Sequence, residues 1–146
     1  LNEAITEGKL SEFDGFHISR NEPPFHNSRF DLLLETQEGA QLMLEAKSCT
    51  LVEEKVALFP DAPTKRGSRH MLELIDTLQY GRAAVCFVIQ RDDVREFRPY
   101  HNNDPNFSDS LIQAVENGVE VYAYRCGVTL EEINIVDRIP VYIRLE

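Results

Sequence analysis

Two carboxylates and a lysine, Asp31, Glu45 and Lys47, are the side chains of this sequence whose types and spacing best suit catalysis. Asp31 lies in the apolar run Arg29 to Glu35, and the other two lie in the run Leu44 to Lys47. Carboxylate oxygens are preferred ligands of hard divalent cations, and a bound cation can activate a water nucleophile. If the chain brings the three together, they form the arrangement with which a hydrolase holds a cation beside an attacking water.

The elements that must position these residues read as an antiparallel hairpin. In a strand, successive side chains alternate between faces, so Asp31, Leu33 and Glu35 point one way while Phe30, Leu32 and Leu34 point the other. Glu45 and Lys47 share a face in the same way. The segment 36–39, which ends in glycine, is typical of a turn. An acid and a lysine two apart on a half-exposed strand are often only solvated, but both runs are apolar enough for buried strands, where a charge is costly unless paired or bound to a cation.

The rest of the chain predicts an α/β fold with a mixed β-sheet flanked by helices. The apolar patterns indicate helices over 2–10, 66–80 and 109–117, the last capped by Ser108. They indicate strands over 16–20, 29–35, 41–47, 83–90 and 119–126, and a short terminal pair over 133–136 and 141–145. Pro23-Pro24 breaks regular structure, Pro60, Pro63 and Gly67 mark an irregular loop, and 102–106 reads as a loop.

A longer pattern resembles the sugar fermentation stimulation protein family. The resemblance covers nearly the whole chain, and its specific part runs from Glu45 to His70. The segments that carry it are Asn27-Ser28-Arg29-Phe30-Asp31, Glu45-Ala46-Lys47-Ser48-Cys49-Thr50-Leu51-Val52-Glu53, Ala57-Leu58-Phe59-Pro60-Asp61-Ala62-Pro63-Thr64, Arg66-Gly67-x-x-His70, Phe87-Val88-Ile89-Gln90-Arg91 and Tyr124-Arg125-Cys126.

The resemblance implies a restriction-endonuclease-like domain of the PD-(D/E)xK superfamily. In this family an OB-type domain precedes the nuclease-like one; here we expect residues 1–146 to be the single nuclease-like domain of a longer chain that begins before Leu1. It further implies that Asp31, Glu45 and the backbone carbonyl of Ala46 bind Mg²⁺ or Mn²⁺, and that Lys47 orients or deprotonates the attacking water. The accessory candidates are Glu7, Arg66, His70, Glu73 and Gln90. Phe30 stands where many superfamily members have proline before the first acid.

Composition limits the other functions. A formal net charge of −10 disfavours binding of a polyanion, although seven cationic residues fall in the stretch from Lys65 to Arg98 and could form a local basic patch. The three cysteines, Cys49, Cys86 and Cys126, are odd in number and set in apolar runs, as expected for buried free thiols of a reducing, cytoplasmic compartment. No apolar run approaches the ~20 residues of a membrane span.

Three functions therefore remain open. The first is a metal-dependent nuclease, acting on DNA in a protein linked to regulation of sugar fermentation and paired as a homodimer to cut both strands. The second is a DNA-binding or regulatory module of the same fold that no longer cleaves. The third is a metalloenzyme acting on a small phosphorylated substrate, which suits the acidic charge but lacks a glycine-rich phosphate loop. The acid, acid and lysine set favours the first, because a binding module has no need for a cation site.

Overall fold

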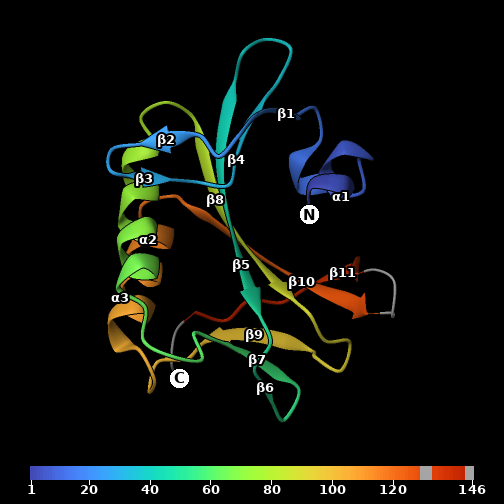
Figure 1. Cartoon of the computed structure of the whole chain (residues 1–146), viewed down its shortest axis with the longest axis vertical. Coiled ribbons are helices and arrows are strands. Elements are labelled where there is room, and N and C mark those ends of the chain that lie inside the picture. The colour runs from blue at the N-terminus through green and yellow to red at the C-terminus, as the bar shows by residue number, and fades with distance from the viewer. Residues whose placement is uncertain (129–132, 144–146) are drawn as a thin grey trace.

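The computed structural model describes residues 1–128 and 133–143, and six of the described strands form one mixed sheet, in the order β1-β4-β5-β8-β10-β11 (Figure 1). The bounds of these strands are β1 (His17–Asn21), β4 (Leu32–Glu35), β5 (Gln41–Cys49), β8 (Arg82–Ile89), β10 (Glu120–Val128) and β11 (Ile133–Ile139). Strands β5, β8 and β10 are parallel, and the neighbours outside them are antiparallel. The predicted mixed sheet flanked by helices is confirmed.

The predicted central hairpin is present, with a shorter first strand. β4 and β5 are antiparallel, in a register that places Leu32 opposite Leu44 and Glu35 opposite Gln41. The prediction of one continuous strand from Arg29 was wrong, because the chain bends at Asp31 and residues 28–29 pair elsewhere. The bend also changes which face Phe30 occupies: Phe30 joins the same buried cluster as Met71 and Phe87, whereas Leu32 and Leu34 of β4 pack on the opposite face of the sheet.

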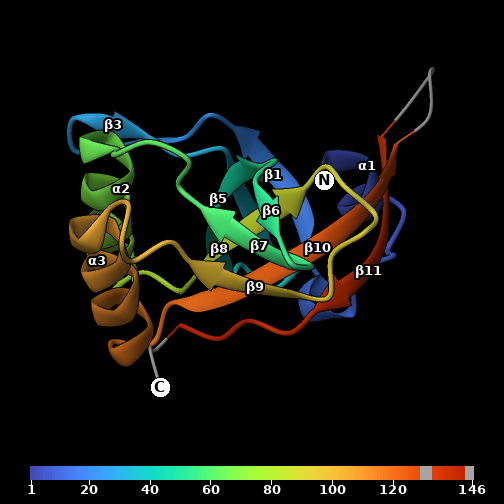
Figure 2. The same cartoon turned by 90° about the horizontal axis from the view of Figure 1, so that it is seen from below.

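Two helices cover one face of the sheet, as Figure 2 shows from below. These are α2 (Lys65–Thr77) and α3 (Pro105–Glu116). Thr64 caps α2, its hydroxyl accepting a hydrogen bond from the Gly67 N–H at 2.9 Å. Gly81, just before β8, lets the chain pass close to the start of β5, since a Cβ at this position would lie 2.3 Å from the Gln41 carbonyl oxygen. The predicted start of the last helix was wrong: Asp104 caps it and Pro105 occupies its first turn.

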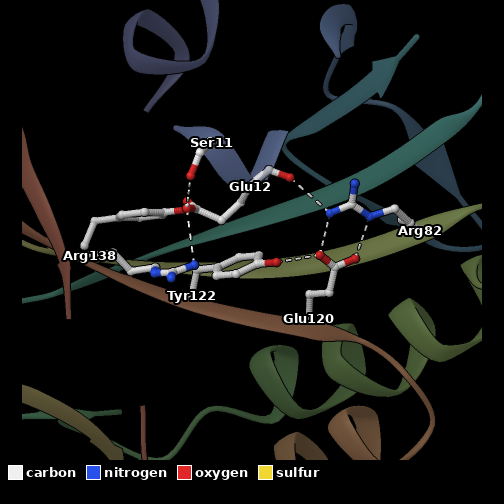
Figure 3. Close-up of polar contacts among 7 residues, drawn as sticks. Ser11, Glu12, Arg82, Glu120, Tyr122 and Arg138 are labelled. Carbon is white, nitrogen blue, oxygen red and sulfur yellow. Dashed lines mark hydrogen bonds and ion pairs between the residues drawn. The ribbon is translucent and has the colours of Figure 1, made fainter. Parts of the chain in front are cut away.

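The opposite face of the sheet is covered by α1 (Asn2–Thr6) and a 3₁₀ turn, Ser11–Phe13. Figure 3 shows the polar contacts that fix this turn on the sheet. Both oxygens of the Glu12 carboxylate are bound, one by the Tyr124 hydroxyl at 2.6 Å and the other by Arg138 at 3.2 Å. Arg82 donates to the Glu12 carbonyl and makes a bidentate pair with Glu120. The N-terminal segment is therefore held to β8, β10 and β11.

Two smaller β-structures complete the described residues. β2 (Pro24–Phe25) and β3 (Ser28–Arg29) form a short hairpin across one end of α2 (Figure 1). β6 (Val52–Glu53), β7 (Val56–Phe59) and β9 (Glu96–Pro99) form a three-stranded sheet. The predicted strand over 141–145 was wrong in its described part: Val141 makes an isolated bridge with Phe97, and residues 144–145 lie outside the described residues. No described helix is both long and apolar enough to span a membrane.

Candidate active site

The bend before β4 places the Asp31 carboxylate beside β5. The Asp31 backbone N–H donates to the Leu44 carbonyl at 3.1 Å, and the backbone pairing of β4 with β5 ends there. The next N–H along this edge of β5, that of Ala46, donates instead to Oδ2 of the Asp31 side chain at 2.7 Å. The side chain thus occupies the place where the next residue of a partner strand would lie, next to Glu45.

Glu45 is a buried carboxylate, only 4% exposed, in the middle of the central strand β5. Its Oε2 receives the Lys47 ammonium at 3.1 Å and also contacts Nδ1 of His70. A buried charge is costly unless it is paired and hydrogen-bonded, and these two donors supply that compensation. Three of the predicted residues, Glu45, Lys47 and His70, therefore meet at one oxygen atom.

His70 reaches the site from α2, where it is 2% exposed. The pKa of this histidine is lowered to about 4, mainly by burial and then by the positive charges of Lys47 and Arg66. The negative charge of Glu73 raises it by a smaller amount. At neutral pH the ring is consequently neutral, and its Nδ1–H can donate to the Glu45 carboxylate. The ring of Phe30 packs against that of His70, with centroids 5.6 Å apart, and closes the apolar side of the site.

Glu45 perturbs the neighbouring Asp31 carboxylate. Burial raises the pKa of Asp31 to about 6, and a hydrogen bond with the Glu45 carboxyl group and its negative charge raise it as well. The Ala46 N–H and the Lys47 charge oppose that rise. The Asp31 and Glu45 carboxylates are near enough to repel each other, and a divalent cation bound by both would remove that repulsion. The donor set therefore fits a hard cation.

The other ligands of such a cation would be backbone and water oxygens. In a strand the N–H and C=O of one residue point to the same side, so the Ala46 carbonyl faces the same edge as the N–H that binds Asp31. Within the described residues, no group of three His, Cys, Asp or Glu side chains is arranged to hold a metal ion. Two carboxylates and a carbonyl suit Mg²⁺, which commonly keeps several waters when bound to protein.

The accessory candidates on α2 lie around His70. Arg66, one turn earlier, is exposed and close enough to lower the pKa of His70. Glu73, one turn later, has one carboxylate oxygen 3.9 Å from the Arg69 side chain. Its other oxygen is buried and has no hydrogen-bond partner among the described residues. The structure thus gathers both residues on the same part of α2 as His70, without direct contact to Glu45.

Two further candidates lie apart from this group. The side-chain amide of Gln90 donates to the Ser48 hydroxyl at 3.1 Å, at the carboxyl ends of β5 and β8, so its neighbour is the residue that follows Lys47. Glu7 ends α1, on the opposite face of the sheet, and pairs with Lys9 at 2.7 Å. The structure does not bring Glu7 to the two carboxylates.

Asp104 is a positioning residue that sequence reasoning missed. Its buried carboxylate accepts hydrogen bonds from the Phe107 N–H at 3.0 Å and from the Thr64 N–H at 2.7 Å. One side chain therefore caps α3 and also fixes the residue that caps α2, the helix that carries His70. The signal was available in the sequence, because an Asp-Pro pair is typical of an N-cap followed by the first helical residue.

Comparison with known proteins points to one family. Residues 1–132 match the "Sugar fermentation stimulation protein RE domain". A sugar fermentation stimulation protein homolog of Desulforamulus reducens is 44% identical over 97% of this chain and 59% of its own length. The homolog of Caldanaerobacter subterraneus subsp. tengcongensis is 44% identical over 95% of this chain and 61% of its own length. The chain thus spans about three fifths of these relatives.

Solved structures agree with the fold. The structure of Pyrococcus furiosus SfsA in complex with Ca²⁺ superposes with a TM-score of 0.90, at 34% sequence identity, and covers 97% of this chain and 62% of that chain. A likeness of this degree extends over the sheet and the helices on both of its faces.

Proposed function

Because this chain belongs to the sugar fermentation stimulation protein family, we propose that it is a metal-dependent nuclease domain that hydrolyses phosphodiester bonds of nucleic acid, with DNA as the substrate. Asp31, Glu45 and the Ala46 carbonyl hold Mg²⁺, with Mn²⁺ as a substitute. Lys47, next to these ligands, acts on the attacking water. The calcium in the P. furiosus relative supports a site for a divalent cation, since Ca²⁺ and Mg²⁺ both prefer oxygen ligands.

The observation that carries this proposal is the buried Glu45 carboxylate, which binds Lys47 at 3.1 Å and lies beside Asp31, whose pKa it raises. A fold has no structural need for two adjacent carboxylates beside the centre of its sheet, and their mutual repulsion costs stability. A cation between them offsets that cost.

Each residue then has a separate role. When bound, the cation polarises a phosphoryl oxygen and stabilises the charge that develops in the transition state. The Lys47 ammonium, held by Glu45, orients the attacking water, and its charge favours loss of the water's proton to solvent. His70 holds the Glu45 carboxylate through Nδ1, and Arg66, exposed near the start of α2, binds a substrate phosphate.

Calorimetric titration of Mg²⁺ and Mn²⁺ into the protein and its Glu45→Gln and Lys47→Met variants tests the proposal, with the same samples then incubated with single- and double-stranded DNA and with RNA. We expect Glu45→Gln to lose both metal binding and cleavage. We expect Lys47→Met to bind metal and to cleave at least a hundredfold more slowly, because removal of one preorganised donor at an active site typically costs about 10²–10³-fold in rate.

The pattern across the variants separates the competing functions. Metal binding without cleavage of any nucleic acid would point to a different phosphate substrate, whereas absence of metal binding would favour the non-cleaving DNA-binding module. Undiminished cleavage by Glu45→Gln would remove the two carboxylates from the reaction. Arg95→Gln is the matched control, since Arg95 is exposed and its backbone N–H binds the β6–β7 hairpin, outside the site.

A further inference from the structure

A chain of aromatic contacts leads from the candidate site to the surface. His70 packs against Phe30, Phe30 lies 6.3 Å from Phe25, and Phe25 in turn contacts Tyr80 at 6.3 Å and His26 at 4.2 Å, between ring centroids. His70 and Phe30 are buried, whereas Tyr80 and His26 are exposed. These rings come from the β2–β3 hairpin, from Phe30 between that hairpin and Asp31, from α2 and from the turn after α2; Figure 1 shows the hairpin across one end of α2.

The outer end of the chain presents free aromatic surface. Tyr80 is 66% exposed, the highest value among the large hydrophobic residues described. Single exposed aromatic residues are ordinary on protein surfaces. Tyr80, in the turn that follows α2, differs because its ring contacts another: Phe25 meets it at an interplanar angle of 73°. Phe25 also contacts His26, whose Nε2 lies 3.6 Å from the Asp76 carboxylate near the end of α2. The two exposed rings thus share one partly buried partner.

A cation lies on the same hairpin. Arg29 stands opposite Pro24 in the β2–β3 pair and is exposed, whereas its neighbour Ser28 is buried. Exposed aromatic rings beside a cation are the features by which proteins bind single-stranded nucleic acid, with the rings stacking on bases and the cation meeting the backbone. A base paired inside a duplex has no free face for such stacking.

We propose that Tyr80 and His26, with Arg29, form a base-stacking platform that binds unpaired nucleotides a few positions from the scissile phosphate. This inference rests on the proposed nuclease function and deepens it, because it assigns single-stranded or frayed nucleic acid as the preferred substrate. The platform is the surface end of the aromatic chain that starts at His70. A strand stacked on it would pass Arg29 and Asp31 before reaching Glu45.

The test measures binding in EDTA, so that it does not depend on cleavage, with short single-stranded oligonucleotides that carry 2-aminopurine at successive positions, and with the matching duplexes. We expect quenching of 2-aminopurine fluorescence at one or two positions. Tyr80→Ala should abolish the quenching and weaken single-strand affinity by about 5- to 150-fold, the range expected for one stacked base. Duplex affinity should change less than twofold. Tyr80→Phe, which keeps the ring, should retain both the quenching and the affinity.

Tyr142→Ala is the matched surface control, because Tyr142 is also half-exposed but contacts Arg98, away from α2. The platform is wrong if the unsubstituted protein binds no single strand, or if Tyr80→Ala binds it as tightly as the control does. Cleavage with Tyr80-independent binding would overturn the platform and keep the nuclease. Tyr80-dependent quenching without cleavage in Mg²⁺ would overturn the nuclease and keep the platform.

Discussion

At the scale of single residues, the site depends on one carboxylate whose charge is fully compensated and another whose charge is not. Glu45 has a lysine and a histidine at the same oxygen. Asp31 has one backbone N–H and an acidic neighbour, and it reaches solvent. The fold therefore holds Glu45 in place, whereas the protonation of Asp31 depends on whether a cation is bound.

The affinity for Mg²⁺ should depend on pH through Asp31. The pKa of Asp31 is raised to about 6, so below that pH a proton must leave before the cation binds. We expect the dissociation constant to rise about tenfold for each pH unit below 6 and to level off above 7. Isothermal titration at several pH values checks this. Asp31→Asn should bind more weakly and show a flatter profile; a profile as steep as that of the unsubstituted protein would exclude Asp31 as the titrating ligand.

The same shift has a definite sign for stability without metal. Since the folded-state pKa lies above the ordinary value of 3.8, Asp31 contributes stability that is present below about pH 4 and lost as the pH rises through about 6. His70, with its lowered pKa, acts in the opposite sense between about 4 and 6.5. The difference between the protein and Asp31→Asn isolates the first contribution, which we expect to be about 1 kcal/mol after screening by solvent.

Removal of His70 should destabilise the protein as well as the site. His70→Ala takes a donor from a buried carboxylate and leaves a cavity, so we expect the free energy of unfolding to fall by about 2–4 kcal/mol. Urea unfolding measures this. Arg69→Ala, an exposed neighbour on the same helix, should change it by less than about 0.5 kcal/mol. Equal midpoints for the two variants would contradict the contact between His70 and Glu45.

At the scale of elements, strong local patterns predicted the chain well and weak ones did not. The alternation around Leu32 and Leu44 and the apolar run of β8 were sufficient to predict the sheet. The β6–β7 hairpin and β9 were missed because they are short and lack the usual signals. The turn between β6 and β7 is Glu54-Lys55, where Asn-Gly would be typical, and β9 ends in Pro99. No local pattern could place His70 on Glu45, since that contact depends on how α2 packs.

That unusual turn supplies a prediction of its own. Glu54 and Lys55 both have positive φ, 50° and 67°, in a two-residue loop, a conformation that costs non-glycine residues stability. We expect the double variant Glu54→Asn/Lys55→Gly to raise the free energy of unfolding by about 1 kcal/mol. Thermal unfolding checks this. Glu54→Ala/Lys55→Ala removes the same side chains without relieving the backbone, and a comparable rise there would assign the effect to charge.

At the scale of the whole molecule, the net charge of −10 requires that any affinity for nucleic acid be local. The logarithm of the binding constant should therefore fall only gently with the logarithm of salt concentration. Arg66→Gln should reduce the slope by about 0.7–0.9, the value of one phosphate contact, while the control Arg95→Gln leaves it unchanged. Filter binding at several salt concentrations measures both slopes. Equal slopes would place the phosphate contacts elsewhere on the protein.

The arrangement of the site along the chain also sets an order in time. Asp31, at the bend before β4, and Glu45, on β5, belong to one local hairpin, whereas His70 arrives only when α2 has crossed over to let β8 pair with β5. Hairpins of this kind form in about 1–10 μs, and contacts distant in sequence form later. The two acids should therefore meet, and repel, before the histidine that fixes one of them is present. A cation present during refolding would reduce the repulsion between the two carboxylates while the hairpin forms, an effect on folding that is separate from its part in the reaction.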